Sequence, residues 1–110
     1  MLIDRVAKSI EMALPNYCTV EKDVTGCTIL SKYKDWCIGF IYKIEDFVYL
    51  SLEYKPYTST TGDTVVFDTI QILLVEFLQD NYVLHKLPER KQRNDMYLIT
   101  EKVYGDWYST

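Results

Sequence analysis

Two neighbouring stretches of this chain, residues 36–44 and 47–54, alternate with a period of two, which is typical of half-buried β-strands. Only Glu45 and Asp46 separate the two stretches, and these residues predict a turn. In the second stretch we expect alternate side chains to face the core and the others to face away from it. The core set is Val48, Leu50 and Leu52, and the outward set is Tyr49, Ser51 and Glu53.

The segment upstream adds two strands to this pair. Residues 17–22 and 27–31 are rich in β-branched and aromatic side chains, and the turn-forming residues 23–26 lie between them. A polar break at residues 32–35 then leads into the stretch that begins at Trp36. The middle of the chain therefore predicts an antiparallel meander of about four strands, whose outer face carries many tyrosines.

A helix is predicted before the meander. In residues 2–14, apolar side chains recur every three to four positions with charged residues between them, and Pro15 ends the pattern.

A second, longer helix is predicted after the meander. Its apolar face runs through residues 66–78, and Asp63 or Thr64 is placed to cap its first turn. Residues 64–67 are β-branched enough to form a strand instead. We expect Asn81 and the stretch up to Pro88 to end this helix.

One last strand is predicted in residues 96–104, after a charged connection at residues 88–95. The sequence thus predicts an α+β fold with an N-terminal helix, an antiparallel meander of about four strands, a second long helix packed on the sheet, and a final C-terminal strand. No repeat and no flexible linker divides the chain, so we expect residues 1–110 to form a single domain.

This order of elements resembles that of class I type III secretion chaperones. The resemblance lies in element order alone, and it implies a homodimer that wraps segments of a partner protein. The order is also similar to that of the double-stranded RNA-binding domain. That family uses basic residues at the start of its second helix, where this chain has Asp63 and Asp68. The sequence therefore assigns the chain to neither family.

Charge, hydropathy and cysteine content indicate which partners and which cellular compartment to expect. The chain has 16 acidic and 12 basic residues, and its net charge of −4 argues against nucleic acid as a partner. No apolar stretch approaches the roughly 20 residues of a membrane span, and charged residues interrupt the start where a signal peptide would be apolar. An odd number of cysteines in apolar surroundings fits a reducing cytoplasm.

The sequence shows no motif for a metal, a cofactor or a catalytic centre. Cys18, Cys27 and Cys37 are spaced too widely for the close pairs of a structural zinc site. Glycine-rich phosphate loops and nucleophile elbows are absent. The cysteines can be explained as buried thiols, and His85 as a histidine at the end of a helix, so neither residue type requires a catalytic role. We therefore expect no enzyme activity, no cofactor and no bound metal.

Two charged surfaces can each be interpreted in two ways. Arg90, Lys91 and Arg93 form the one basic cluster, which could hold a phosphate or an acidic partner, or could be a solvated loop. Acidic side chains along the second helix and at strand ends could imitate a phosphate backbone to a DNA-handling enzyme, or could simply form a soluble face. They are Asp63, Asp68, Glu76 and Asp80 along the helix, with Asp35, Glu45 and Asp46 at strand ends.

Aromatic residues are the least ordinary feature. Ten tyrosines and two tryptophans exceed what a core of this size needs, and several fall at polar-side or loop positions. Such residues are favoured at protein interfaces, although some tyrosines could simply fill the outer face of a twisted sheet. The partner-binding residues that we predict are Tyr33, Trp36, Tyr49, Tyr54, Tyr57, Asp68, Glu76 and Asp80.

These features predict a small, cytoplasmic, non-enzymatic binding module. We expect an inhibitor or adaptor of the phage or mobile-element type, with host defence proteins among its candidate targets, which occludes a partner protein through an aromatic and acidic surface. The first alternative is a homodimeric, chaperone-like scaffold. The second is a small-molecule-binding protein with a pocket between the second helix and the sheet.

Overall fold

The computed structural model describes residues 1–54, 60–88 and 95–102 of the chain, and it confirms the predicted α+β class. Two helices and six strands make up the described part. In chain order they are α1 (Leu2–Ala13), β1 (Cys18–Lys22), β2 (Gly26–Ser31), β3 (Cys37–Ile44), β4 (Phe47–Leu52), α2 (Thr61–Asn81), β5 (Tyr82–Lys86) and β6 (Met96–Glu101).

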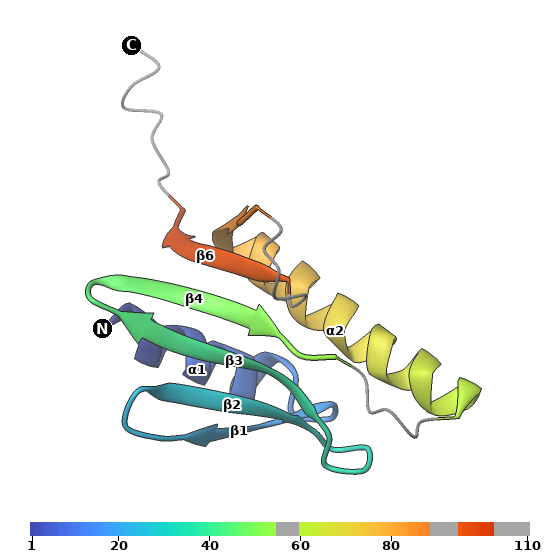
Figure 1. Cartoon of the computed structure of the whole chain (residues 1–110). Coiled ribbons are helices and arrows are strands. Elements are labelled where there is room, and N and C mark those ends of the chain that lie inside the picture. Colours follow the sequence, from blue (N-terminus) through green and yellow to red (C-terminus); the bar gives the residue numbers. More distant parts are fainter. Residues whose placement is uncertain (55–59, 89–94, 103–110) are drawn as a thin grey trace.

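The described strands form one antiparallel sheet in the order β1-β2-β3-β4-β6-β5 (Figure 1). Consecutive hairpins join the first four strands, as the predicted meander requires. After α2 the chain returns to this sheet, where β6 pairs with β4 and β5 forms the far edge. The predicted last strand is β6 as far as Glu101; Lys102 lies beyond the strand, and residues 103–104 of the predicted range lie outside the described residues.

Both helices pack on one face of the sheet, which we call the inner face (Figure 1). The core is built from the apolar stripes of the two helices and from every second residue of the strands. Complete burial of one such aliphatic side chain contributes roughly 1.5–3 kcal/mol to stability. The buried helix residues are Val6, Ala7 and Ile10 on α1 and Phe67, Ile70, Leu74 and Leu78 on α2, and they meet Cys27, Ile29, Ile41, Val48, Leu50 and Ile99 of the sheet.

Neither helix of the described part is long and apolar enough to cross a membrane. Although α2 has 21 residues, carboxylates such as Asp68 and Glu76 interrupt its apolar surface.

A β-bulge in β3 places two successive residues on the inner face. Ile29 of β2 lies opposite Gly39 while Leu30 lies opposite Cys37, so Ile38 is the extra residue. Ile38 is fully buried. Beside it, a Cβ atom on Gly39 would lie 2.6 Å from the carbonyl oxygen of Ser51 in β4, so this position has room only for glycine.

The start of α2 corrects one prediction. The N-cap is Thr60, rather than Asp63 or Thr64, and the helix is continuous through residues 64–67, where a strand was the alternative. The Thr60 side chain accepts a hydrogen bond from the Asp63 N–H, and the Asp63 carboxylate accepts one from the Thr60 N–H, which completes a capping box. Asp63 therefore serves the cap from the third helical position.

The strand β5 was missing from the prediction. The helix ends at Asn81, at the start of the predicted stretch, and Tyr82 begins β5 at once, with no connecting residue. His85 accordingly lies in a strand and not at a helix end, which corrects its predicted place. Its Nε2 lies 2.9 Å from the Thr100 Oγ1 of β6.

Gly39→Ala should destabilise the protein by about 1–3 kcal/mol, because the added methyl group meets backbone of the neighbouring strand that can move only if β3 and β4 separate. Urea denaturation would measure the loss. Gly62→Ala is the matched control, since a Cβ there meets only the Thr60 Oγ1, at 3.9 Å, and alanine favours a helix. Equal stability of the two variants would contradict the bulge geometry.

Candidate functional site

The face of the sheet opposite the helices, which we call the outer face, is apolar at its centre. The short turn between β3 and β4 sets their register, so Tyr42 lies opposite Tyr49 and Ile44 lies opposite Phe47. Besides Cys37 at the start of β3, three neighbouring strands each point three side chains to this face. They are Phe40, Tyr42 and Ile44 of β3, Phe47, Tyr49 and Ser51 of β4, and Met96, Leu98 and Thr100 of β6.

None of these outer-face side chains carries a formal charge at neutral pH. Tyr42 and Tyr49 stack with their ring centroids 5.7 Å apart and their planes at 24°. The Tyr42 hydroxyl also lies 3.9 Å from the sulfur of Met96. The centre of the outer face is therefore a continuous surface of packed aromatic and apolar groups.

No described helix or strand covers the outer face. Ile44 is 54% exposed, Phe47 is 51% exposed and Phe40 is 36% exposed. An antiparallel sheet with one face in water usually places polar residues there, and a contiguous exposed apolar patch marks an interaction site. The predicted partner-binding residue Tyr49 belongs to this surface.

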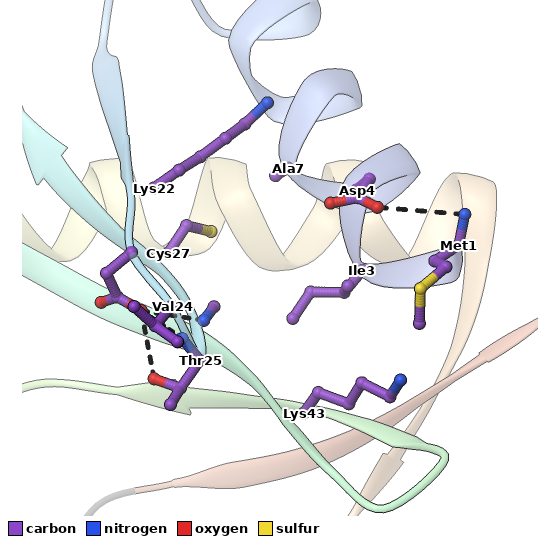
Figure 2. A pocket seen from close by; sticks show the side chains of 11 residues that line it. Met1, Ile3, Asp4, Ala7, Lys22, Val24, Thr25, Cys27 and Lys43 are labelled. Atoms are coloured by element: carbon purple, nitrogen blue, oxygen red, sulfur yellow. Dashed lines mark hydrogen bonds and ion pairs between the residues drawn. The ribbon is translucent and has the colours of Figure 1, made fainter.

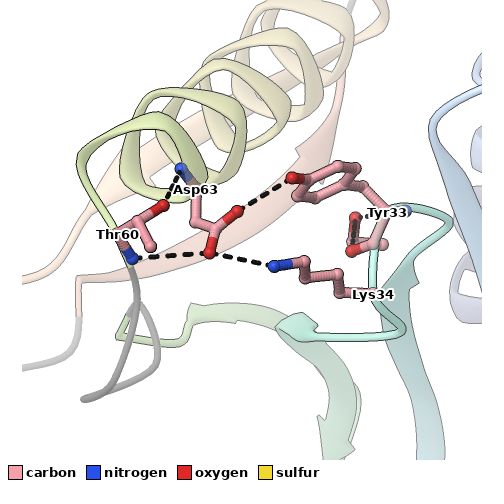
Figure 3. Close-up of polar contacts among 5 residues, drawn as sticks. Tyr33, Lys34, Thr60 and Asp63 are labelled. Carbon is pink, nitrogen blue, oxygen red and sulfur yellow. Dashed lines mark hydrogen bonds and ion pairs between the residues drawn. The ribbon is translucent and has the colours of Figure 1, made fainter.

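Tyr33 and Trp36, two other predicted binding residues, form contacts that anchor α2 to the loop between β2 and β3. Figure 3 shows the contacts of Tyr33. The Tyr33 hydroxyl donates a hydrogen bond of 2.8 Å to Asp63 Oδ1, and Lys34 Nζ lies 3.1 Å from Asp63 Oδ2. Trp36 packs edge-on against Tyr33 and also contacts Phe67. These contacts give the loop a structural role at the N-terminus of α2.

Asp63 is almost fully buried, and its environment favours the charged carboxylate. The hydrogen bond from Tyr33 and then that from Lys34, with smaller contributions from Thr60, lower the pKa of Asp63 to about 2. The same contact with Asp63 raises the pKa of the Tyr33 phenol. The capping carboxylate is therefore ionised throughout the ordinary pH range.

Asp63→Asn should reveal this ionisation in the pH dependence of stability. The folded-state pKa lies below the unfolded value of roughly 3.9, so the carboxylate stabilises the fold above that value and the contribution disappears as pH falls towards about 2. The variant should unfold at lower urea concentration than the native chain at pH 7, and the two midpoints should converge between about pH 4 and pH 2.

Asp68→Asn is the control for this prediction, because it removes one charge from the exposed side of the same helix without breaking the capping box. A difference between Asp63→Asn and the native chain that stays constant down to about pH 2 would contradict the assignment.

Of the three acidic residues predicted to bind a partner, two line the same groove and the third does not. Asp68 and Glu76 line a groove of about 410 Å³ between α2 and the β4–β6 side of the sheet, and Asp95 completes a set of three carboxylates. Asp80 lies outside this groove, and its carbonyl oxygen accepts a hydrogen bond from Lys102. No lysine or arginine is among the described residues that line the groove. Its apolar lining consists of Leu52, Ile72, Val75 and Tyr97.

Of the remaining predicted residues, the structure describes Tyr54 alone. Tyr54 is half exposed just beyond the end of β4. Tyr57 lies outside the described residues, as do the basic residues Arg90, Lys91 and Arg93. The structure thus separates the aromatic outer face from the acidic groove, whereas the sequence suggested a single surface with both characters.

A further cavity of about 450 Å³ lies between the first turn of α1, the β1–β2 turn and β3 (Figure 2). Lys22 and Lys43 extend along its sides, but carboxylates line it as well. Asp4 lies 3.9 Å from the amino group of Met1. Asp23 accepts hydrogen bonds of 2.8 and 2.9 Å from two backbone N–H groups of its own turn, and these lower its pKa. Because the lining carries charges of both signs, it favours no ligand class.

The predicted interior position of the thiols is confirmed for two of the three cysteines. Cys18 and Cys27 are buried in the core, and Cys37 is partly buried. Burial raises the pKa of Cys18 and of Cys27 to about 11. At neutral pH both are therefore protonated thiols that behave as small apolar side chains.

The sequence did contain a signal for the outer face. In β3 both alternating sets are largely apolar, since Ile41 faces the helices while Phe40 and Tyr42 face away. A strand that is apolar on both sides is typical of a sheet covered on both faces. That signal predicts a second covering layer, which the described residues do not supply.

Comparisons of this chain with protein-family models, with curated proteins and with solved structures found no significant match.

Proposed function

We propose that this chain is a non-enzymatic protein-interaction module and that the outer face is the surface it uses. The observation that carries the proposal is the uncharged set of exposed and half-buried side chains on β3, β4 and β6, with Tyr42 and Tyr49 stacked at its centre. Surfaces that are rich in aromatic residues and methionine and poor in charge resemble the cores of protein interfaces. Covering such a surface removes apolar area from water, which favours association.

The described side chains support binding over catalysis. Burial raises the pKa of Cys18, Cys27 and Cys37, which disfavours the thiolate that a nucleophile would need. The Asp63 carboxylate, whose pKa is lowered to about 2, is occupied by the capping box and by Tyr33. These perturbations have structural causes.

Two kinds of module would use the outer face. An inhibitor or adaptor of the phage or mobile-element type would place it against a different protein and occlude that protein. A homodimeric scaffold would place it against a second copy of the same chain. Both remain cytoplasmic binding proteins without cofactor or metal in this proposal, and they differ in what covers Tyr49 and its neighbours.

The double substitution Ile44→Glu/Phe47→Glu should abolish the association that the outer face provides. Both side chains are about half exposed beside a turn, so charge at these positions disfavours a covering protein while the core stays intact. A tagged chain would be incubated with lysate of the source cell, and captured proteins, including untagged copies of this chain, would be quantified by mass spectrometry. At least a tenfold loss is expected, equivalent to about 1.4 kcal/mol of binding free energy.

Val65→Glu serves as the control for this experiment. Val65 is 60% exposed on α2, on the opposite layer of the molecule, so the substitution adds a charge without touching the outer face. If both variants capture the same proteins as the native chain, the outer face is not the binding surface.

The acidic groove supports a second candidate function. Three carboxylates around an apolar floor, with no lining cation in the described part of the chain, suit a segment that carries both lysine or arginine and apolar side chains. In this proposal α2 and the sheet hold a basic, amphipathic segment of a partner protein. Asp68 and Glu76, predicted from the sequence, would face its charges.

Asp68→Lys/Glu76→Lys should weaken binding of a synthetic lysine-rich amphipathic peptide by about tenfold or more, because attraction is replaced by repulsion. Fluorescence anisotropy at two salt concentrations would measure the effect, and the native affinity should fall as salt rises. Asp80→Lys, outside the groove, changes the overall charge in the same direction and is the control. Asp80→Lys changes the net charge by half as much as the double substitution, so a loss half as large on a logarithmic scale would show that the peptide senses only net charge.

A further inference from the structure

We propose that the protein seated on the outer face is a second copy of this chain, so that two sheets pack face to face. This inference rests on the proposed function, since it identifies the occupant of the same surface.

Charge is the first argument for a second copy. In a twofold-symmetric interface the same patch meets itself, so any net charge in the patch is repelled by its own copy. The chain as a whole has a net charge of −4, yet the outer-face positions of β3, β4 and β6 carry none. Among the described strands, carboxylate and imidazole groups reach this face only on the edge strands, as Glu21 and His85. Cys37 of β3 also faces this side, opposite Leu30, and burial raises the pKa of its thiol. The Glu53 carboxylate, just after β4, lies at one end of the patch, so the centre of the patch carries no charge.

The character of the patch gives the second argument. Interfaces between different proteins that also exist separately are usually about as polar as the rest of the surface, whereas permanent homodimer interfaces are more apolar. Here Phe40, Ile44 and Phe47 are exposed around the stacked pair of tyrosines, and Leu98 and Met96 continue the patch onto β6. A partner that covers this face permanently fits such a surface better than a transient one.

Geometry gives the third argument. Two copies of one sheet have the same twist, and sheets that pack face to face align at about 30° with a separation of about 10 Å. A copy therefore supplies a matching surface without any change of conformation. Five strand spacings of about 4.8 Å make this face roughly 24 Å wide, which gives the interdigitating side chains room for a broad contact.

The oligomeric state in solution tests the inference. Size-exclusion chromatography with light scattering, on the full chain at high micromolar concentration, should give twice the 13.0 kDa mass of one chain. Ile44→Glu/Phe47→Glu should elute at the single-chain mass, and Val65→Glu should keep the doubled mass. Phe47→Lys is a second face variant in case the double substitution disturbs folding, which circular dichroism would detect.

Two results would overturn the inference. The first is a native chain that stays at 13.0 kDa at every concentration. The second is a dimer that survives both face variants, because it would then form through an open edge, β1 or β5, and leave the outer face free. A monomeric chain that still loses a captured protein in the face variant would overturn the second copy alone and leave the proposed function standing.

Discussion

The register between β3 and β4 determines the chemistry of both faces of the sheet. Ile41 and Leu50 lie opposite each other and point to the helices, while the next pair, Tyr42 and Tyr49, points away from them. A slip of one residue would exchange the two faces and move a core pair into water. The turn at Glu45 and Asp46 fixes this register, so a two-residue connection determines both where the helices dock and where the uncharged surface lies.

The contacts around Asp63 illustrate how a residue can look functional in sequence and be structural in the fold. Tyr33 and Trp36 were selected because exposed aromatic residues favour interfaces, yet their rings and hydroxyl connect a loop to the first turn of α2. The loop needs such contacts, since Lys34 and Asp35 both adopt the left-handed backbone conformation, which L-residues rarely adopt. The aromatic surface that remains exposed is instead the one that contains Tyr49.

The sequence predicted the elements whose periodicity is strong and missed those that depend on tertiary contacts. The meander, both helices and the turn at Glu45 follow from alternation, spacing and turn residues. The strand β5 was not predicted because it follows α2 without a break, so its residues resemble the end of a helix. The cap at Thr60 was not predicted because several hydroxyl residues precede α2. Only the reciprocal hydrogen bonds with Asp63 identify Thr60 as the N-cap.

The surfaces were harder to predict than the elements for a physical reason. Periodicity shows that Tyr49 and Phe40 leave the core of their own strand, but it does not show whether another layer covers them. The separation of the outer face from Asp68 and Glu76 arises because both helices dock on the same side of the sheet, and that choice is made by long-range packing. A sequence can therefore contain the right residues for a binding surface without indicating which of them share it.

The place of β6 beside β4 has a consequence for how the molecule forms. Strands β1 to β4 are connected by short turns, so each can pair with the next as soon as the turn between them forms. Val48, by contrast, meets Ile99 only after the whole of α2 and β5 has been brought back to the sheet. Closing so long a loop costs entropy before any contact compensates, which makes the joining of β6 to β4 the kinetically demanding step of folding. Until it occurs, β4 is an open edge in addition to β1, and the growing chain can pair with other chains along it.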